Sequence, residues 1–92
     1  MTITPDGIPT QEPDYRLEML DGEALLFHPA QGSLVHCNQM GAVIWHLCNG
    51  ERTVEEIISL LAEAYPEAEP EVARDVQRTL GQFLEAHAIR MG

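Results

Sequence analysis

The sequence predicts an α+β fold, in which a three-stranded antiparallel sheet is followed by three helices. Tyr15, Leu17 and Met19 alternate with Arg16 and Glu18 before Asp21-Gly22, a dipeptide typical of two-residue hairpin turns. Thr53 and Glu56 have the spacing of a helix capping box. After Pro70, apolar residues recur at helical spacing towards the C-terminus. Strands followed by helices in this order are typical of α+β proteins.

The strands are expected in the first half of the chain. The segments YRLEML and EALLFH flank the hairpin turn, and SLVHC follows a second turn at residues 29–32. These three strands form a meander, so we expect the third strand, residues 33–37, to lie at the edge of the sheet.

Three helices are expected after the strands. Asn38 is placed to cap the first helix, and Asn49-Gly50 ends it. The second helix follows Thr53 and ends before Pro66, and the third runs from Pro70 to about residue 87. The expected apolar stripes are Met40, Val43, Ile44 and Leu47 in the first helix, Val54, Ile57, Ile58, Leu61 and Tyr65 in the second, and Val72, Val76, Leu80, Phe83 and Leu84 in the third.

The N-terminal segment has a different composition from the rest of the chain. Residues 1–14 contain three prolines with polar spacers and offer little apolar surface. We therefore predict a disordered or extended arm over residues 1–14 and a folded domain over residues 15–92.

The length of 92 residues is that of one domain with one core. The chain contains no run of about 18 apolar residues, so we expect no membrane insertion. The N-terminus has neither the basic nor the apolar stretch of a secretory signal. We therefore expect a cytoplasmic protein with reduced thiols.

The charge of the chain argues against nucleic-acid binding. Fifteen acidic residues stand against five basic residues, which gives a formal net charge of -10. Nucleic-acid binding draws much of its affinity from neutralising phosphates, and the sequence contains no concentrated basic segment. We expect no nucleic-acid partner.

A metal-binding or redox-sensing role is the alternative to be weighed, because His36-Cys37 and His46 with Cys48 place four soft ligands close together in sequence. Neighbouring residues on a strand point to opposite faces, and the first helix separates the two cysteines by roughly 16 Å. A disulfide tolerates only about 7 Å between Cα atoms. These residues, together with His28 and His87, are therefore not expected to close a metal site or a disulfide within one chain.

No catalytic motif is recognisable in this sequence. The two cysteines are the only plausible nucleophiles, and their only basic neighbours are His36 and His46. We therefore expect a protein that is not an enzyme, with no catalytic residues, no metal and no cofactor.

Four features of the sequence occur together: Cys37-Asn38 after the third strand, a helix containing AVIW, the turn CNGERTVEEI and a third helix that opens with EVARDV. In these features the chain resembles the PqqD family over about residues 15–89. That family is the stand-alone form of the peptide-recognition domain of ribosomal-peptide (RiPP) modification pathways. The resemblance implies a winged-helix-like fold.

The resemblance also implies how a peptide would bind. The leader segment of a precursor peptide would add as a strand to the third strand and lie beside the third helix. The residues that the resemblance places at the peptide are Leu34, Val35, His36 and Cys37 along the strand, Asp75, Arg78, Thr79 and Gln82 on the opposite wall, and Val76 and Phe83 at the floor.

The resemblance implies a peptide chaperone without chemistry of its own. Such a protein presents the precursor to a radical-SAM maturation enzyme, as in pyrroloquinoline quinone biosynthesis or a related RiPP pathway. An exposed edge strand would also permit a homodimer through strand pairing.

Overall fold

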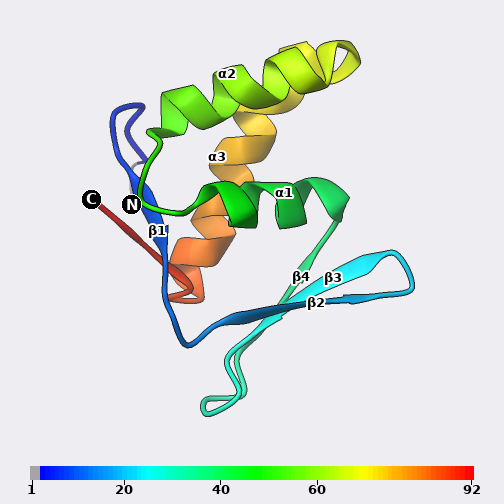
Figure 1. The fold of residues 1–92 in the computed structure, drawn as a ribbon, viewed down its shortest axis with the longest axis vertical. Helices are drawn as coiled ribbons and strands as arrows, with labels where there is room; N and C mark the ends of the chain where they lie inside the picture. Colours follow the sequence, from blue (N-terminus) through cyan, green and yellow to red (C-terminus); the bar gives the residue numbers. More distant parts are fainter. Residues whose placement is uncertain (1–2) are drawn as a thin grey trace.

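The computed structural model describes residues 3–92, which form two sheets and three α-helices (Figure 1). The three-stranded antiparallel sheet and the three helices after it confirm the predicted α+β fold. The elements in chain order are β1 Pro9–Gln11, β2 Arg16–Leu20, β3 Glu23–Phe27, β4 Leu34–Cys37, α1 Gln39–Leu47, α2 Val54–Ala64, the short 3-10 helix η1 Pro66–Ala68, α3 Glu69–Glu85 and β5 Ile89–Met91.

The hairpin of β2 and β3 closes as its sequence predicts. Leu20 pairs with Glu23, so the connection has two residues. Asp21 and Gly22 have φ angles of 51° and 82°, the left-handed backbone that a type I′ turn requires at both positions. β4 pairs with the other side of β3, which gives the strand order β2-β3-β4. β4 is therefore an edge strand, as predicted.

The two predicted helix caps are confirmed. The Asn38 Oδ1 accepts a hydrogen bond of 2.8 Å from the Gly41 amide at the start of α1. Thr53 Oγ1 accepts from the Glu56 amide at 3.1 Å, and the Glu56 carboxylate accepts from the Thr53 amide at 2.9 Å. Both halves of the capping box are thus formed at the start of α2.

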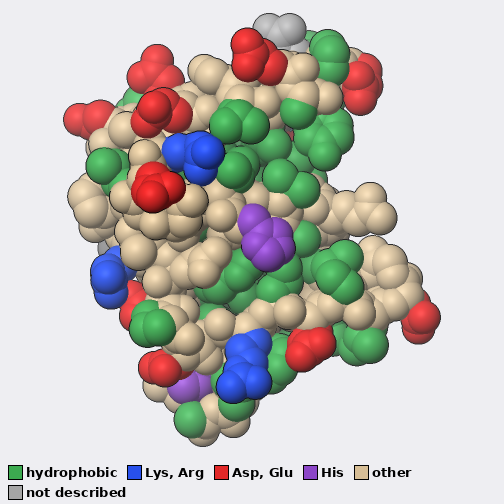
Figure 2. All heavy atoms as spheres, in the orientation of Figure 1, with side chains coloured by type: hydrophobic (Ala, Val, Ile, Leu, Met, Phe, Trp, Pro, Cys, Tyr) green, Lys and Arg blue, Asp and Glu red, His purple; other side chains and the backbone are tan. Residues whose placement is uncertain are grey.

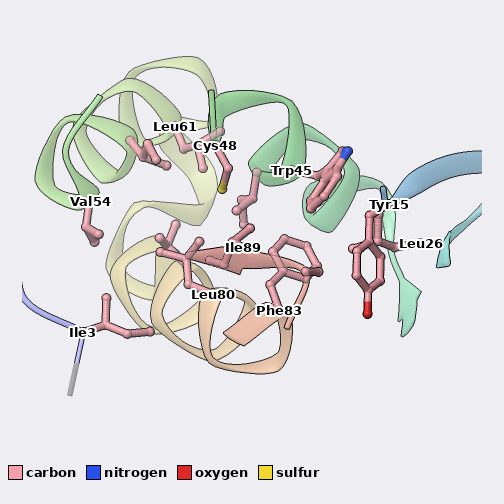
Figure 3. Packing of buried hydrophobic residues seen from close by; sticks show 14 of the residues in the cluster. Ile3, Tyr15, Leu26, Trp45, Cys48, Val54, Leu61, Leu80, Phe83 and Ile89 are labelled. Atoms are coloured by element: carbon pink, nitrogen blue, oxygen red, sulfur yellow. The ribbon is translucent and has the colours of Figure 1, made fainter. Parts of the chain in front are cut away.

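The core lies where the helices meet the inner face of the three-stranded sheet (Figure 3). Trp45 contacts Phe83 edge-to-face with ring centroids 5.6 Å apart, and it lies beside Tyr15. The fully buried side chains with the largest volumes are Phe83, Leu26, Ile44, Ile57, Leu61, Leu80, Val54, Val76, Pro9 and Cys48. The core thus joins residues from β3, all three helices and the N-terminal segment.

Two predicted apolar stripes differ from the observed buried faces. In α1 the buried face consists of Gly41, Ala42, Ile44 and Trp45, whereas the other predicted positions of that helix are only half-buried. The reason is that α1 contacts both the sheet and α3, so its buried face is wider than one stripe. In α2 the predicted stripe ends in Tyr65, which is exposed because the helix has already ended there.

Of the two forms predicted for residues 1–14, a disordered or an extended arm, the disordered one does not fit the described residues 3–14, which include the strand β1. β1 pairs antiparallel with β5, which joins the N-terminal segment to the end of the chain. Ile3 and Pro9 are buried. Local composition missed this order because the stabilising contacts come from distant residues. Residues 1 and 2 lie outside the described residues.

β5 was not predicted from the sequence. It has three residues, too few to reveal the alternation by which strands are recognised. Within residues 3–92, no helix combines the length and the apolar character that crossing a lipid bilayer requires.

Candidate functional site

The outer edge of β4 has free backbone groups at alternate residues. The His28 amide donates to the Ser33 carbonyl at 3.0 Å, and these two residues continue the register in which Phe27 faces Leu34. In an antiparallel ladder, facing pairs that exchange hydrogen bonds alternate with pairs that do not. Val35 and Cys37 therefore bond to β3. The N–H and C=O groups of Leu34 and His36 point away from the sheet.

The pairing on the other side of β3 agrees with this assignment. A two-residue type I′ loop is closed by a hydrogen-bonded pair, here Leu20 and Glu23, so the odd-numbered residues of β3 bond to β2. Its even-numbered residues, such as Leu26 opposite Val35, are then the ones that bond to β4. The β2–β3 pairing and the β3–β4 pairing thus give the same assignment of hydrogen-bonded residues on β3.

A groove of about 230 Å³ separates this edge from α3. It is bounded by the end of β4, the beginning of α1 and one side of the middle of α3. The residues that line the groove are His36, Cys37, Asn38, Gly41, Arg78, Thr79 and Gln82. A second hollow, of about 600 Å³, continues from it past the hairpin turn and shares His36, Cys37 and Asn38 with it. An extended segment that follows β4 would therefore pass both hollows.

The tight junction between β4 and α1 depends on Gly41. A Cβ atom at this position would lie 2.9 Å from the Cys37 Cβ, closer than non-bonded carbon atoms approach. Asn38 lies between these two residues in sequence and caps the helix with its side-chain oxygen. The glycine and the cap together allow α1 to begin directly at the end of the edge strand.

The α3 wall of the groove is polar. Arg78 donates from Nη2 to Asp75 Oδ1 at 3.0 Å, an ion pair between residues three apart on the helix. The Arg78 side chain is 61% exposed and that of Asp75 is 34% exposed. Thr79 and Gln82 lie on the groove side of the same helix. The groove thus has a cation at its border that already has an intrahelical partner.

The structure brings together half of the residues that the resemblance placed at a peptide. His36, Cys37, Arg78, Thr79 and Gln82 line one groove. Leu34 is exposed on the same strand, Val35 packs against the core, and Asp75 is paired with Arg78.

The two residues that the resemblance placed at the floor of the site lie in the core instead. Val76 and Phe83 are 1% and 0% exposed and belong to the core, so they do not form the floor of the groove in this structure. They share α3 with the wall residues but occupy its buried face. Two lining residues were not predicted: Asn38 carries a capping signal, and Gly41 carries the signal of a glycine inside a helix, which often marks close approach.

The cysteines and histidines do not converge. Both cysteines are free, and burial raises the pKa of the Cys48 thiol to about 12 and that of Cys37 above its ordinary value. Neither thiol is activated as a thiolate. His28 accepts backbone hydrogen bonds from Ala30 and Gln31 in its own turn. Among the described residues, no three His, Cys, Asp or Glu side chains form a group that could hold a metal ion.

The charged residues are unevenly distributed over the surface. Figure 2 shows acidic side chains over the upper part of one face, where α2 lies in Figure 1, whereas the middle of that face carries mainly apolar and uncharged side chains. The groove residues include no Asp or Glu. The groove is therefore a region of low negative charge on an acidic protein.

These features define a small α+β domain whose sheet has an open edge beside a helix. The family model described as coenzyme PQQ synthesis protein D (PqqD) matches residues 23–89, and the chain belongs to the PqqD family. Among solved structures, one titled "TbiB1 in Complex with the TbiA(beta) Leader Peptide" matches with a TM-score of 0.70 and 22% sequence identity. The match covers 88% of this chain and 94% of that chain. A comparison with curated proteins gave no match.

Proposed function

We propose that this protein binds the leader segment of a ribosomally made precursor peptide as an additional strand on β4. The observation that carries the proposal is the free edge of β4 beside the groove to α3. Leu34 and His36 supply two outward N–H groups and two outward C=O groups to a guest strand. Such backbone pairing gives affinity that does not depend on sequence, and side-chain pockets then select the guest.

The comparisons support the choice of a leader peptide. One solved structure that shares this fold is, by its title, a complex with a leader peptide. The family description refers to synthesis of coenzyme PQQ. The protein itself carries no chemistry in this proposal. It presents the precursor to a radical-SAM maturation enzyme, in pyrroloquinoline quinone biosynthesis or in a related RiPP pathway, and so raises the effective concentration of the substrate at that enzyme.

The same edge would also serve for pairing with a second copy of the chain. Strand addition and dimer formation through β4 would then exclude each other, because both use the outward groups of Leu34 and His36. A homodimer of this kind should dissociate when the leader peptide is added, which a measurement of molar mass by light scattering would detect.

The proposal is tested by an amide NMR titration with the precursor peptide encoded beside the gene. Leader binding on β4 should shift the amide signals of residues 33–37 and of α3 around Arg78. Shifts located elsewhere on the protein, or the lack of any shift, would contradict the proposal.

A substitution at Leu34 tests the backbone pairing itself. Leu34→Pro removes one outward N–H at the first residue of an edge strand, a position where proline is tolerated. Leu34→Ala is the matched control, because it removes the same side chain and keeps the N–H. We expect Leu34→Pro to bind the leader at least about tenfold more weakly than Leu34→Ala, since a pairing group is lost and the ring obstructs the guest strand. Equal affinity of the two folded variants would contradict strand addition.

A further inference from the structure

The groove beside β4 differs in charge from the protein around it. The chain has fifteen acidic residues and a formal net charge of -10. None of the seven residues that line the groove is acidic, and one of them is Arg78. Four of the five arginines therefore lie outside the groove. The fifth, Arg78, lines the groove beside β4, where a peptide paired with β4 would lie.

Several lining side chains have hydrogen-bond donors to offer. The Asn38 oxygen is occupied by the Gly41 amide, which leaves the side-chain NH₂ group of Asn38 as its free part. Thr79 contributes a hydroxyl and Gln82 an amide NH₂ group. A negatively charged group in the groove would thus meet one guanidinium and several neutral donors.

Arg78 already has an ion-pair partner in the free protein. It is paired with Asp75 at 3.0 Å, and its own side chain in this pair is 61% exposed. Exposed ion pairs of this kind contribute little, because water competes and both side chains lose freedom. Arg78 can therefore exchange this partner at small cost, and a guanidinium can bind a second carboxylate on its free side as well.

We infer that the groove accepts an aspartate or glutamate side chain of the bound peptide, with Arg78 transferring from Asp75 to the guest carboxylate. This inference rests on the proposed function, because the guest strand on β4 is what brings the carboxylate to the groove. Asp75 then acts as a competitor inside the protein. It holds Arg78 in place in the free state and weakens binding of any acid that is not also paired with β4.

A carboxylate site at Arg78 would also affect which peptides the protein selects. Backbone pairing alone does not fix which residues of an extended peptide face the protein, and a shift by one residue turns every side chain to the other face. An acidic residue that must meet Arg78 fixes this register. The protein would then recognise a peptide by the position of one acidic residue as well as by its capacity to form a strand.

A peptide library provides a test that needs no known precursor. A random library of short peptides is displayed and selected against the whole protein and against two variants. Arg78→Gln removes the groove cation. Arg74→Gln is the matched control, since Arg74 lies one turn earlier on α3, is exposed and does not line the groove.

Selection on the wild-type protein and on Arg74→Gln should enrich Asp or Glu at one fixed position, and selection on Arg78→Gln should not. For one selected peptide, we expect replacement of that acid by its amide to weaken binding about three- to tenfold on the wild-type protein and not on Arg78→Gln. Asp75→Asn should tighten binding of the acidic peptide about two- to threefold and leave binding of the amide peptide unchanged.

The outcomes separate this inference from the proposed function. Peptides that shift the Leu34 and His36 amide signals but show no acidic preference would overturn the carboxylate site and leave strand addition in place. An acidic preference that persists in Arg78→Gln would also overturn it. Failure to enrich any peptide would count against both.

Discussion

The amide of Val54, the first residue of α2, donates a hydrogen bond of 2.9 Å to the carbonyl of Gly7. The next amide, that of Glu55, donates to the Pro5 carbonyl, also at 2.9 Å. The first N–H groups of a helix have no partner within it. Here the N-terminal segment supplies partners for two of them and Thr53 supplies a third. Residues 3–9 thus lie against the N-terminus of α2, although about 45 residues separate the two segments in sequence.

Removal of residues 1–8 should destabilise the whole domain. Ile3 would leave the core, and the α2 amides would lose their partners. We expect the free energy of unfolding to fall by about 2–4 kcal/mol, measured by urea denaturation with Trp45 fluorescence. Asp6→Asn changes an exposed residue of the same segment and is the control. An unchanged denaturation midpoint in the truncated chain would contradict this role.

The capping box of α2 gives a second prediction. Thr53→Ala removes the hydroxyl that accepts the Glu56 amide, and it should lower the free energy of unfolding by about 1 kcal/mol. Ser59→Ala is the matched control, because it removes a hydroxyl from an exposed position inside the same helix. Thermal denaturation followed by circular dichroism compares the two. A control that is destabilised as much as Thr53→Ala would contradict the capping role.

The Glu56 carboxylate, the second member of the capping box, makes the stability of the protein depend on pH. Hydrogen bonds from Thr53 lower the pKa of the Glu56 carboxyl, so the folded protein binds its proton less readily than the unfolded chain does. The stabilisation is complete above the unfolded value of about 4.3 and is lost as the pH falls through the lower folded value. We therefore expect the difference in melting temperature between the wild-type protein and Glu56→Gln to shrink as the pH falls below about 4. A constant difference over this range would refute the assignment.

Cys48 should be inert in the native protein. Its thiol is fully buried, and burial raises its pKa to about 12. In Cys37→Ala, which leaves Cys48 as the single thiol, labelling by a thiol reagent at neutral pH should proceed no faster than opening of the core. The reference is the same variant in urea, where labelling should be immediate. Rapid labelling of the native variant would show that the residue is accessible after all.

The burial of Cys48 also determines how the stability of the protein changes at alkaline pH. The folded pKa of Cys48 lies above the unfolded value of about 8.5, so the protonated thiol is favoured by folding. Its contribution to stability is complete below that unfolded value and is lost as the pH rises towards the folded one. Denaturation midpoints of the wild-type protein should therefore fall more steeply above about pH 8.5 than those of Cys48→Ala. Parallel curves for the two proteins would contradict this expectation.

Elements with local signals could be predicted from the sequence. The Asp21-Gly22 turn, the Asn38 cap and the capping box each determine structure within a few residues, and all three form as expected. β1 and β5 could not be predicted, because each has three residues and exists through its pairing with a segment about 80 residues away. A pattern within a few neighbouring residues does not indicate pairing with so distant a segment.

The candidate site was predictable only in part. Its edge strand follows from the meander of three strands, whereas the approach of α3 to that strand was expected from the family resemblance. Helical periodicity placed Val76 and Phe83 in the apolar stripe of α3, and both are buried in the structure; their place at the floor of the peptide site was implied only by the resemblance. Gly41 was missed because its role is a distance to Cys37 across the junction of two elements, which periodicity does not express.

The pairing of β1 with β5 also determines where the chain can be extended. Gly92 exchanges backbone hydrogen bonds with Ile8, so the end of the sequence lies on the β1–β5 pair. In Figure 1 this pair lies to one side of α3 and β4 lies to the other. A further domain joined after Gly92 would leave the free edge of β4 open. The edge of β4 would therefore stay accessible in a separate protein and in one module of a larger chain alike, without any change to the residues that form it.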